Sequence, residues 1–158
     1  MKNLDDADVG SIEREIYIEA SPATVFDVVS RPEHVAQWWP DDATYEMTPG
    51  SAGEITFGDP AAGGKVQTLT VLEVEPPTTF SFAWTHQPGT EPTAETAMFV
   101  TFTLTPHGTG TLLRFVETGF RERGWDDATA RATFTEHAAG WNHFLPRLAP
   151  YAERLTQR

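Results

Sequence analysis

Apolar and polar residues alternate near the start of the chain in a pattern that is typical of a half-buried β-strand. Over residues 11–20, Ile12, Arg14, Ile16 and Ile18 fall on one face, while mostly acidic residues fall on the other. A period of two residues with one apolar face predicts a strand whose second face meets solvent. We therefore expect the ordered domain to begin here, with residues 1–10 forming a disordered tail.

Two short helices are predicted directly after this strand. Ser21 followed by Pro22 combines a preferred N-cap residue with proline at the first helical position. This helix ends where Arg31 precedes Pro32, because a residue before proline disfavours the helical conformation. A second helix, over residues 33–39, stops at the next proline. Neither segment is long enough to cover a sheet.

A series of strands occupies the middle of the chain. Pairs of glycine or proline interrupt the alternating pattern at intervals, and such pairs mark turns. The predicted strands are residues 54–57, 65–75, 79–85, 96–105 and 111–118. Strands joined by such short turns must pair antiparallel.

The apolar period changes from two residues to that of a helix near residue 126. One helical stripe contains Phe134, Ala138, Trp141, Leu145, Leu148 and Leu155. Pro146 lies inside this helix, and we expect it to kink the helix. The long helix is the one element that can cover the apolar face of the sheet. The pattern thus predicts a single α+β domain over residues 11–158, in which a curved antiparallel sheet of about six strands wraps around the C-terminal helix.

Composition narrows the classes of function. The chain of 158 residues has no cysteine, which excludes disulfides, thiolate catalysis and cysteine-bound zinc. Its net charge of −12 disfavours nucleic acids and anionic membrane surfaces as partners. The first ten residues do not resemble a signal peptide, and no apolar run is long enough to insert into a membrane. We therefore expect a cytoplasmic protein, either a monomer or a homodimer.

Several segments of the sequence resemble a known family. They read IEREIYIEASPATVFDVVSRPEHVAQWWP, VLEVEPPTTFSFAW, TFTLTPHGTGTLLRFVETGF and GWNHFLPRL. Together they resemble the SRPBCC (START/Bet v 1-like) superfamily over residues 11–157, and within it the group related to the C-terminal domain of the activator of the heat-shock-protein-90 ATPase. The resemblance implies the helix-grip fold. The chain departs from many relatives at Glu117-Thr118-Gly119, where they carry a histidine before the last pair, and at Pro146.

The eighteen aromatic residues, five of them tryptophan, provide candidate walls for a small-molecule pocket. The candidate ligand-binding residues are Trp38, Trp39, Phe57, Trp84, Met98, Glu117, Phe120, Trp125, Phe134 and Trp141. The alternative is that most of the aromatic residues simply fill the core. Trp38 and Trp39 are adjacent, so on a short helix they should not both point inward. We expect one of them to face a pocket mouth, a loop or a partner.

Glu117 is the candidate for a polar contact inside the domain. It shares the inward parity of Leu113 and Phe115, whereas Arg114 has the outward parity. A buried carboxylate is costly unless it is paired or hydrogen-bonded, so Glu117 should bind a ligand, a neighbouring side chain or a trapped water. His137 or His143 on the last helix could reach it.

Metal, cofactor and catalytic motifs are not found in the sequence. The five histidines are scattered without metal-ligand spacing, and no serine lies in a G-x-S-x-G context, so we assign no metal, no cofactor and no catalytic residue. Our first hypothesis is a binding module for a small hydrophobic or amphipathic ligand between the sheet and the last helix. The second, which follows from the resemblance, is a protein-interaction module that contacts a chaperone. The third is a cyclase or hydrolase that acts on a polyketide-like substrate.

Overall fold

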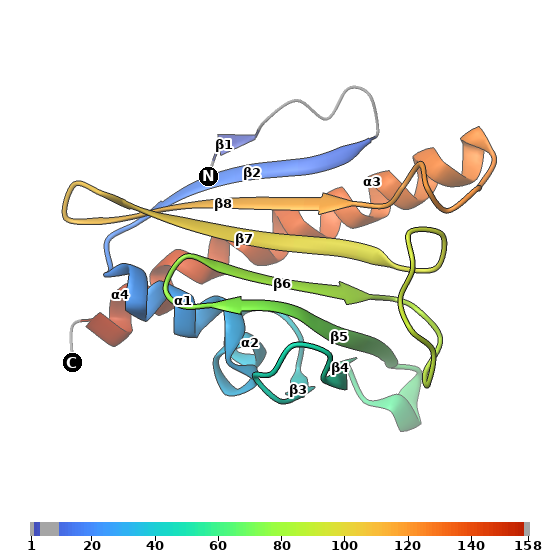
Figure 1. Cartoon of the computed structure of the whole chain (residues 1–158), viewed down its shortest axis with the longest axis horizontal. Coiled ribbons are helices and arrows are strands. Elements are labelled where there is room, and N and C mark those ends of the chain that lie inside the picture. Colours follow the sequence, from blue (N-terminus) through green and yellow to red (C-terminus); the bar gives the residue numbers. More distant parts are fainter. Residues whose placement is uncertain (1, 4–9, 157–158) are drawn as a thin grey trace.

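A single antiparallel sheet forms the body of the domain in the computed structural model, which describes residues 2–3 and 10–156. The strands follow the spatial order β1-β2-β8-β7-β6-β5-β4-β3 (Figure 1). Their bounds are β1 Lys2–Asn3, β2 Ser11–Ile18, β3 Asp42–Thr44, β4 Ala52–Phe57, β5 Lys65–Glu75, β6 Thr79–Trp84, β7 Met98–His107 and β8 Gly110–Thr118. The six predicted strands are present, and β1 and β3 add one short strand at each edge. Most of the predicted tail, residues 1 and 4–9, lies outside the described residues.

Helices begin and end close to the predicted residues. They are α1 Pro22–Ser30, α2 Pro32–Trp38, α3 Asp127–Phe144 and α4 Leu148–Thr156, with 3₁₀ turns at Pro60–Ala62 and Leu145–Arg147. The Ser21 hydroxyl caps α1 by accepting a hydrogen bond from the Thr24 amide at 3.2 Å. The kink predicted at Pro146 is confirmed, because the 3₁₀ turn around this proline separates α3 from α4. Within the described residues, no helix is both long and apolar enough to cross a bilayer.

The C-terminal helices lie across one face of the sheet, as the helix-grip fold requires (Figure 1). The backbone of α4 packs closely on β2, and α1 and α2 pack against α4 and close that end of the grip. The backbone of α3 stands farther from the strands, and large side chains fill the space between them. Trp141 of α3 bridges this gap, with its ring 4.6 Å from that of Phe115 on β8. The standoff of α3 makes room for a pocket at the open end of the grip.

Trp38 and Trp39 both lie inside the domain, so the prediction that they could not both point inward is wrong. Their exposed fractions are 0% and 5%. Trp38 is the last residue of α2, and Trp39 leaves the helical conformation with φ −120° and ψ −93°. This departure turns the second indole back toward the sheet, where the two rings stack 6.2 Å apart. The Trp38 indole N–H donates to the carbonyl of Val28 at 2.9 Å.

Candidate functional site

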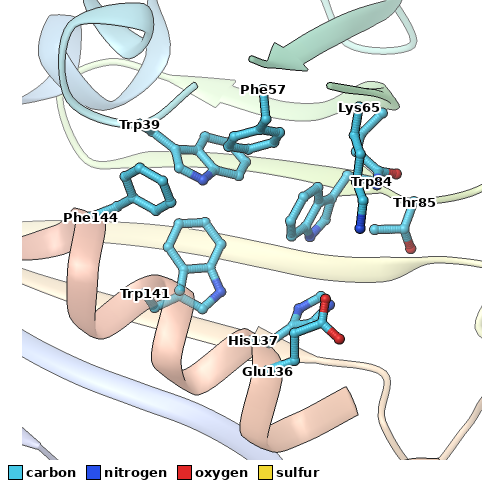
Figure 2. Close-up of a pocket in the computed structure, with 11 residues that line it drawn as sticks. Trp39, Phe57, Lys65, Trp84, Thr85, Glu136, His137, Trp141 and Phe144 are labelled. Carbon is cyan, nitrogen blue, oxygen red and sulfur yellow. The ribbon is translucent and has the colours of Figure 1, made fainter. Parts of the chain in front are cut away.

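A pocket of about 170 Å³ opens between α3 and the strands β4, β5 and β6 (Figure 2). Its lining combines five aromatic side chains with a polar rim. The lining residues are Trp39, Phe57, Lys65, Gln67, Trp84, Thr85, Glu136, His137, Gly140, Trp141 and Phe144. The pocket is partly open to solvent.

The aromatic walls come from both halves of the grip. Trp39 directly follows α2, and Phe57 and Trp84 are the last residues of β4 and β6. Trp141 and Phe144 lie on α3, on the other side of the pocket (Figure 2). Trp39 is the centre of the group, with its ring 4.8 Å from that of Trp141 and 5.2 Å from that of Trp84. The rings of Phe57 and Phe144 are also in contact, with their centroids 6.0 Å apart. These mutual ring contacts hold the walls in place without a ligand.

A fully buried carboxylate lies behind the aromatic walls. Glu117, at the end of β8, is 0% exposed, which confirms the prediction that it points inward. Its Oε2 atom accepts a hydrogen bond from the Trp84 indole at 2.8 Å, and its Oε1 atom accepts one from the Trp141 indole at 2.9 Å. The Nδ1 atom of His137 lies 2.9 Å from Oε1. Neighbouring side chains, one of the kinds of partner that the sequence left open, bind both carboxylate oxygens, and these hydrogen bonds fix the orientation of both indoles.

His137 is the titratable group that faces the pocket. An ionised carboxylate only accepts hydrogen bonds, so the Nδ1 atom of His137 carries the proton in its bond to Glu117. Burial is the largest influence on the pKa of His137 and lowers it, and Arg123 also lowers it. The hydrogen bond and charge of Glu117, together with the charge of Glu136, outweigh these effects, so the pKa of His137 is raised above its ordinary value. The Nε2 atom is left to face the pocket.

The rim of the pocket is polar and carries both signs of charge. Lys65 is one of only two lysines in the chain, and it extends beside Trp84 and Thr85 (Figure 2). Thr85 has a φ of 68°, a left-handed conformation that is strained for a β-branched residue. Its hydroxyl accepts a hydrogen bond from Arg123 at 3.3 Å. Glu136 is on the opposite, helical side of the rim.

Of the candidate residues, the structure brings Trp39, Phe57, Trp84 and Trp141 together as pocket walls. Glu117 lies directly behind them. Trp38, Met98, Phe120 and Phe134 are buried in the core and are not pocket-lining residues. Trp125 is half-buried outside the pocket, with the Arg123 guanidinium 4.6 Å from its ring centroid.

The pocket also contains residues that the sequence did not single out as ligand contacts. Gly140 and Phe144 flank Trp141 on α3, at helical spacings of one and three residues from it. Positions 137, 140, 141 and 144 share one helical face, and this spacing is the signal that identifies them. Lys65 and Gln67 carry no comparable signal, because their place beside the pocket depends on how β5 pairs with β4. Among the described residues, no cluster of three or more histidine or acidic side chains is arranged to hold a metal ion.

Comparisons with known proteins match nearly the whole chain. A family model described as "Activator of Hsp90 ATPase homolog 1-like protein" matches residues 19–153. The crystal structure of protein MLL2253 from Mesorhizobium loti is 28% identical, with a TM-score of 0.72, over 91% of this chain and 97% of that one. The Aha1 dimer from Colwellia psychrerythraea is 21% identical, with a TM-score of 0.68, over 88% of this chain and 92% of that one, and it shares the fold.

A further similar structure is DynU16, a protein of the dynemicin biosynthetic locus. It is 27% identical, with a TM-score of 0.69, over 95% of this chain. The present chain spans about half the length of DynU16, because the match covers 48% of that protein. A search of curated proteins found no match.

Proposed function

Because the chain belongs to the family of Activator of Hsp90 ATPase homolog 1-like proteins, we propose that it uses the grip of this fold to bind a small aromatic molecule. The observation that carries the proposal is the set of five aromatic side chains around an open cavity of about 170 Å³. Ligand pockets are typically apolar and concave, with a few polar groups that fix orientation. The rim residues Lys65, Gln67 and Glu136 supply such groups here.

The size of the cavity limits the ligand. A cavity of about 150 Å³ engineered into another protein binds benzene. The pocket described here, at about 170 Å³, therefore holds one aromatic ring with a small substituent. A steroid or a long acyl chain would leave most of its apolar surface in water, which removes most of the gain from burial. Any larger part of the ligand must lie at the rim, near Lys65 and Glu136.

The family context is compatible with a small-molecule ligand. DynU16 is a protein of the dynemicin biosynthetic locus, and it shares 27% identity with this chain. The fold hosts several functions, so the ligand must be argued from the pocket and not from the family. A single aromatic ring is the ligand that the walls around Trp39 and Trp141 favour.

Nitrobenzene is a suitable first probe, because it is one neutral ring and it quenches tryptophan fluorescence on contact. We expect saturable quenching by nitrobenzene, since Trp39, Trp84 and Trp141 line the pocket. Gly140→Leu supplies the matched control. An ideal Cβ at Gly140 has no atom within 4 Å, and Gly140 lines the pocket, so we expect the larger side chain of leucine to extend into the cavity.

Gly140→Leu should abolish the saturable quenching, whereas Gly140→Ala should weaken it far less. Both variants should stay folded, because replacing glycine inside a helix favours the helix. Quenching that increases linearly with nitrobenzene concentration, and equally in all three proteins, would mean collisions at the surface and no binding in the pocket. That result would refute the proposal.

The second candidate function is an interaction with a chaperone of the heat-shock-90 class, which the description of the matching family favours. The acidic surface and the adjacent Trp38 and Trp39, one of which could face a partner, are the sequence features that favour this function. Both indoles are buried, so the pair offers no docking surface. For this reason the pocket has the stronger support. Stimulation of the ATPase rate of such a chaperone by the full chain, unchanged in Gly140→Leu, would instead support the chaperone function.

A further inference from the structure

We propose that the pocket selects single-ring ligands that carry a weakly acidic hydroxyl or carboxyl group, and that it holds them as anions against the Nε2 atom of His137. The inference rests on the proposed binding of an aromatic ring. It adds the chemical class of the ligand and the atom that recognises it.

The position of His137 is fixed by its neighbours. Its Nδ1 atom is bonded to Glu117 at 2.9 Å, and its side chain is 15% exposed. The imidazole lies between Trp84, at 5.4 Å, and Phe120, at 5.5 Å, measured between ring centroids. These contacts restrict rotation of the ring. Because Nδ1 is committed to the buried carboxylate, Nε2 is the polar atom that His137 presents to the pocket.

An acidic ligand can form a hydrogen bond with the Nε2 atom whether the ligand arrives protonated or ionised. When the ligand arrives as a neutral acid, its O–H bond breaks, the proton moves to Nε2, and the electron pair remains on the ligand oxygen. When the ligand arrives as an anion, it meets an imidazolium whose Nε2–H group donates to it. Both routes give the same complex, in which the imidazolium lies between the Glu117 carboxylate and the ligand anion. Such charge-assisted hydrogen bonds are stronger than neutral ones.

The charged groups around His137 come from four parts of the chain. Glu117 at the end of β8 and Glu136 on α3 favour the imidazolium, and together they raise the pKa of His137 against the opposing effects of burial and Arg123. Lys65 on β5 adds a positive charge at the rim. A ligand anion therefore meets two cationic groups, His137 and Lys65, and one carboxylate at the rim, that of Glu136. A cationic ligand would either lie beside these two positive charges or require His137 to lose its second proton.

The test uses 4-nitrophenol, whose ionised form absorbs visible light and whose neutral form does not. At mildly acidic pH, where free 4-nitrophenol is mostly neutral, we expect the phenolate band to appear when the wild-type protein is added. His137→Asn is the most informative variant. The asparagine amide N–H replaces the Nδ1 donor toward Glu117, and the substitution removes the Nε2 atom. In this variant the band should be lost. Its affinity for 4-nitrophenol should also fall about tenfold or more relative to nitrobenzene.

If His137→Asn does not fold, the visible spectrum of 4-nitrophenol with the wild-type protein is sufficient to test the inference. Binding of 4-nitrophenol without the phenolate band would overturn the inference, and so would a band that persists in His137→Asn. Tighter binding of phenyltrimethylammonium than of 4-nitrophenol would also overturn it, because the rings would then act as a cage for a cation. In all three cases nitrobenzene would still bind, and the proposed function would stand. Failure of nitrobenzene to bind would refute both.

Discussion

The buried carboxylate of Glu117 should be the residue on which both the stability of the domain and the shape of the pocket depend most. Replacing it with glutamine keeps the size of the side chain but exchanges one acceptor oxygen for an NH₂ donor. The wild-type oxygens accept hydrogen bonds from Trp84, Trp141 and His137 at 2.8–2.9 Å. In Glu117→Gln, the NH₂ group must face at least one of these N–H donors.

The expected cost follows from counting these bonds. One buried N–H group without an acceptor costs about 1–3 kcal/mol, and the remaining bonds lose the contribution of the negative charge. We therefore predict that Glu117→Gln lowers the free energy of unfolding by about 2–5 kcal/mol. Urea unfolding at neutral pH, followed by circular dichroism, measures this difference. The far-ultraviolet signal is preferable to fluorescence, because the substitution changes the surroundings of two indoles.

Trp84→Phe provides the matched control, because it removes one of the three donors and keeps an aromatic ring in the wall. In the double variant, the glutamine NH₂ can face the position from which the indole N–H has been removed. The double-mutant cycle should therefore give a coupling energy of about 1–3 kcal/mol. Glu117→Gln within about 0.5 kcal/mol of wild type, or strictly additive effects in the cycle, would refute the three-donor arrangement.

Four further predictions concern pH (two of them), the pocket wall and the first helix. The pKa of His137 is raised in the folded domain, so protonation of this imidazole stabilises the fold. The stabilisation is complete below the ordinary histidine pKa of about 6.5 and is lost as pH rises through the raised value. His137→Asn should remove this pH-dependent loss of stability, measured by urea unfolding at a series of pH values. His86 has the opposite sign: burial lowers its pKa, so stability should fall as pH drops below about 6.5, and His86→Gln should remove this acid-side loss. Gly140→Ala should raise the free energy of unfolding by about 0.5–1 kcal/mol, and no gain would contradict the open space at that position. Ser21→Ala, which deletes the cap on the Thr24 amide, should cost about 1 kcal/mol; an unchanged unfolding midpoint would contradict a role for this cap.

Features that depend on local chemistry were predictable from the sequence. The alternation along β8 separates Arg114, which is exposed and pairs with Glu13, from the buried Glu117. The same parity on β2 gave Arg14 an inward position, and the structure buries it with its Nε atom donating to Asn142 on α3 at 3.0 Å. Proline and capping signals set the ends of the helices for a similar reason, because they act on the backbone within a few residues.

Features that depend on distant contacts were not predictable. The direction of Trp39 depends on a single residue leaving the helix, and no local pattern indicates that departure. The sequence offered both His137 and His143 as partners of Glu117 and could not choose between them, because the strand and helix patterns do not specify the relative orientation of β8 and α3. β3 has only three residues, too few for an alternating pattern to appear. The pocket itself arises from the standoff of α3, which is a consequence of how the large side chains pack between helix and sheet.

The indole N–H signals of the five tryptophans offer the most direct test of ligand binding in the pocket. In a ¹H–¹⁵N correlation spectrum each indole gives one signal, and titration with nitrobenzene reports where the ring binds. We predict saturable shifts for Trp39, Trp84 and Trp141, which line the pocket, and unchanged signals for Trp38 and Trp125, which do not. The Trp84 and Trp141 signals are the most informative, because both N–H groups donate to Glu117. If the three pocket signals stay in place, or if Trp125 alone shifts, the ring does not bind between the sheet and α3.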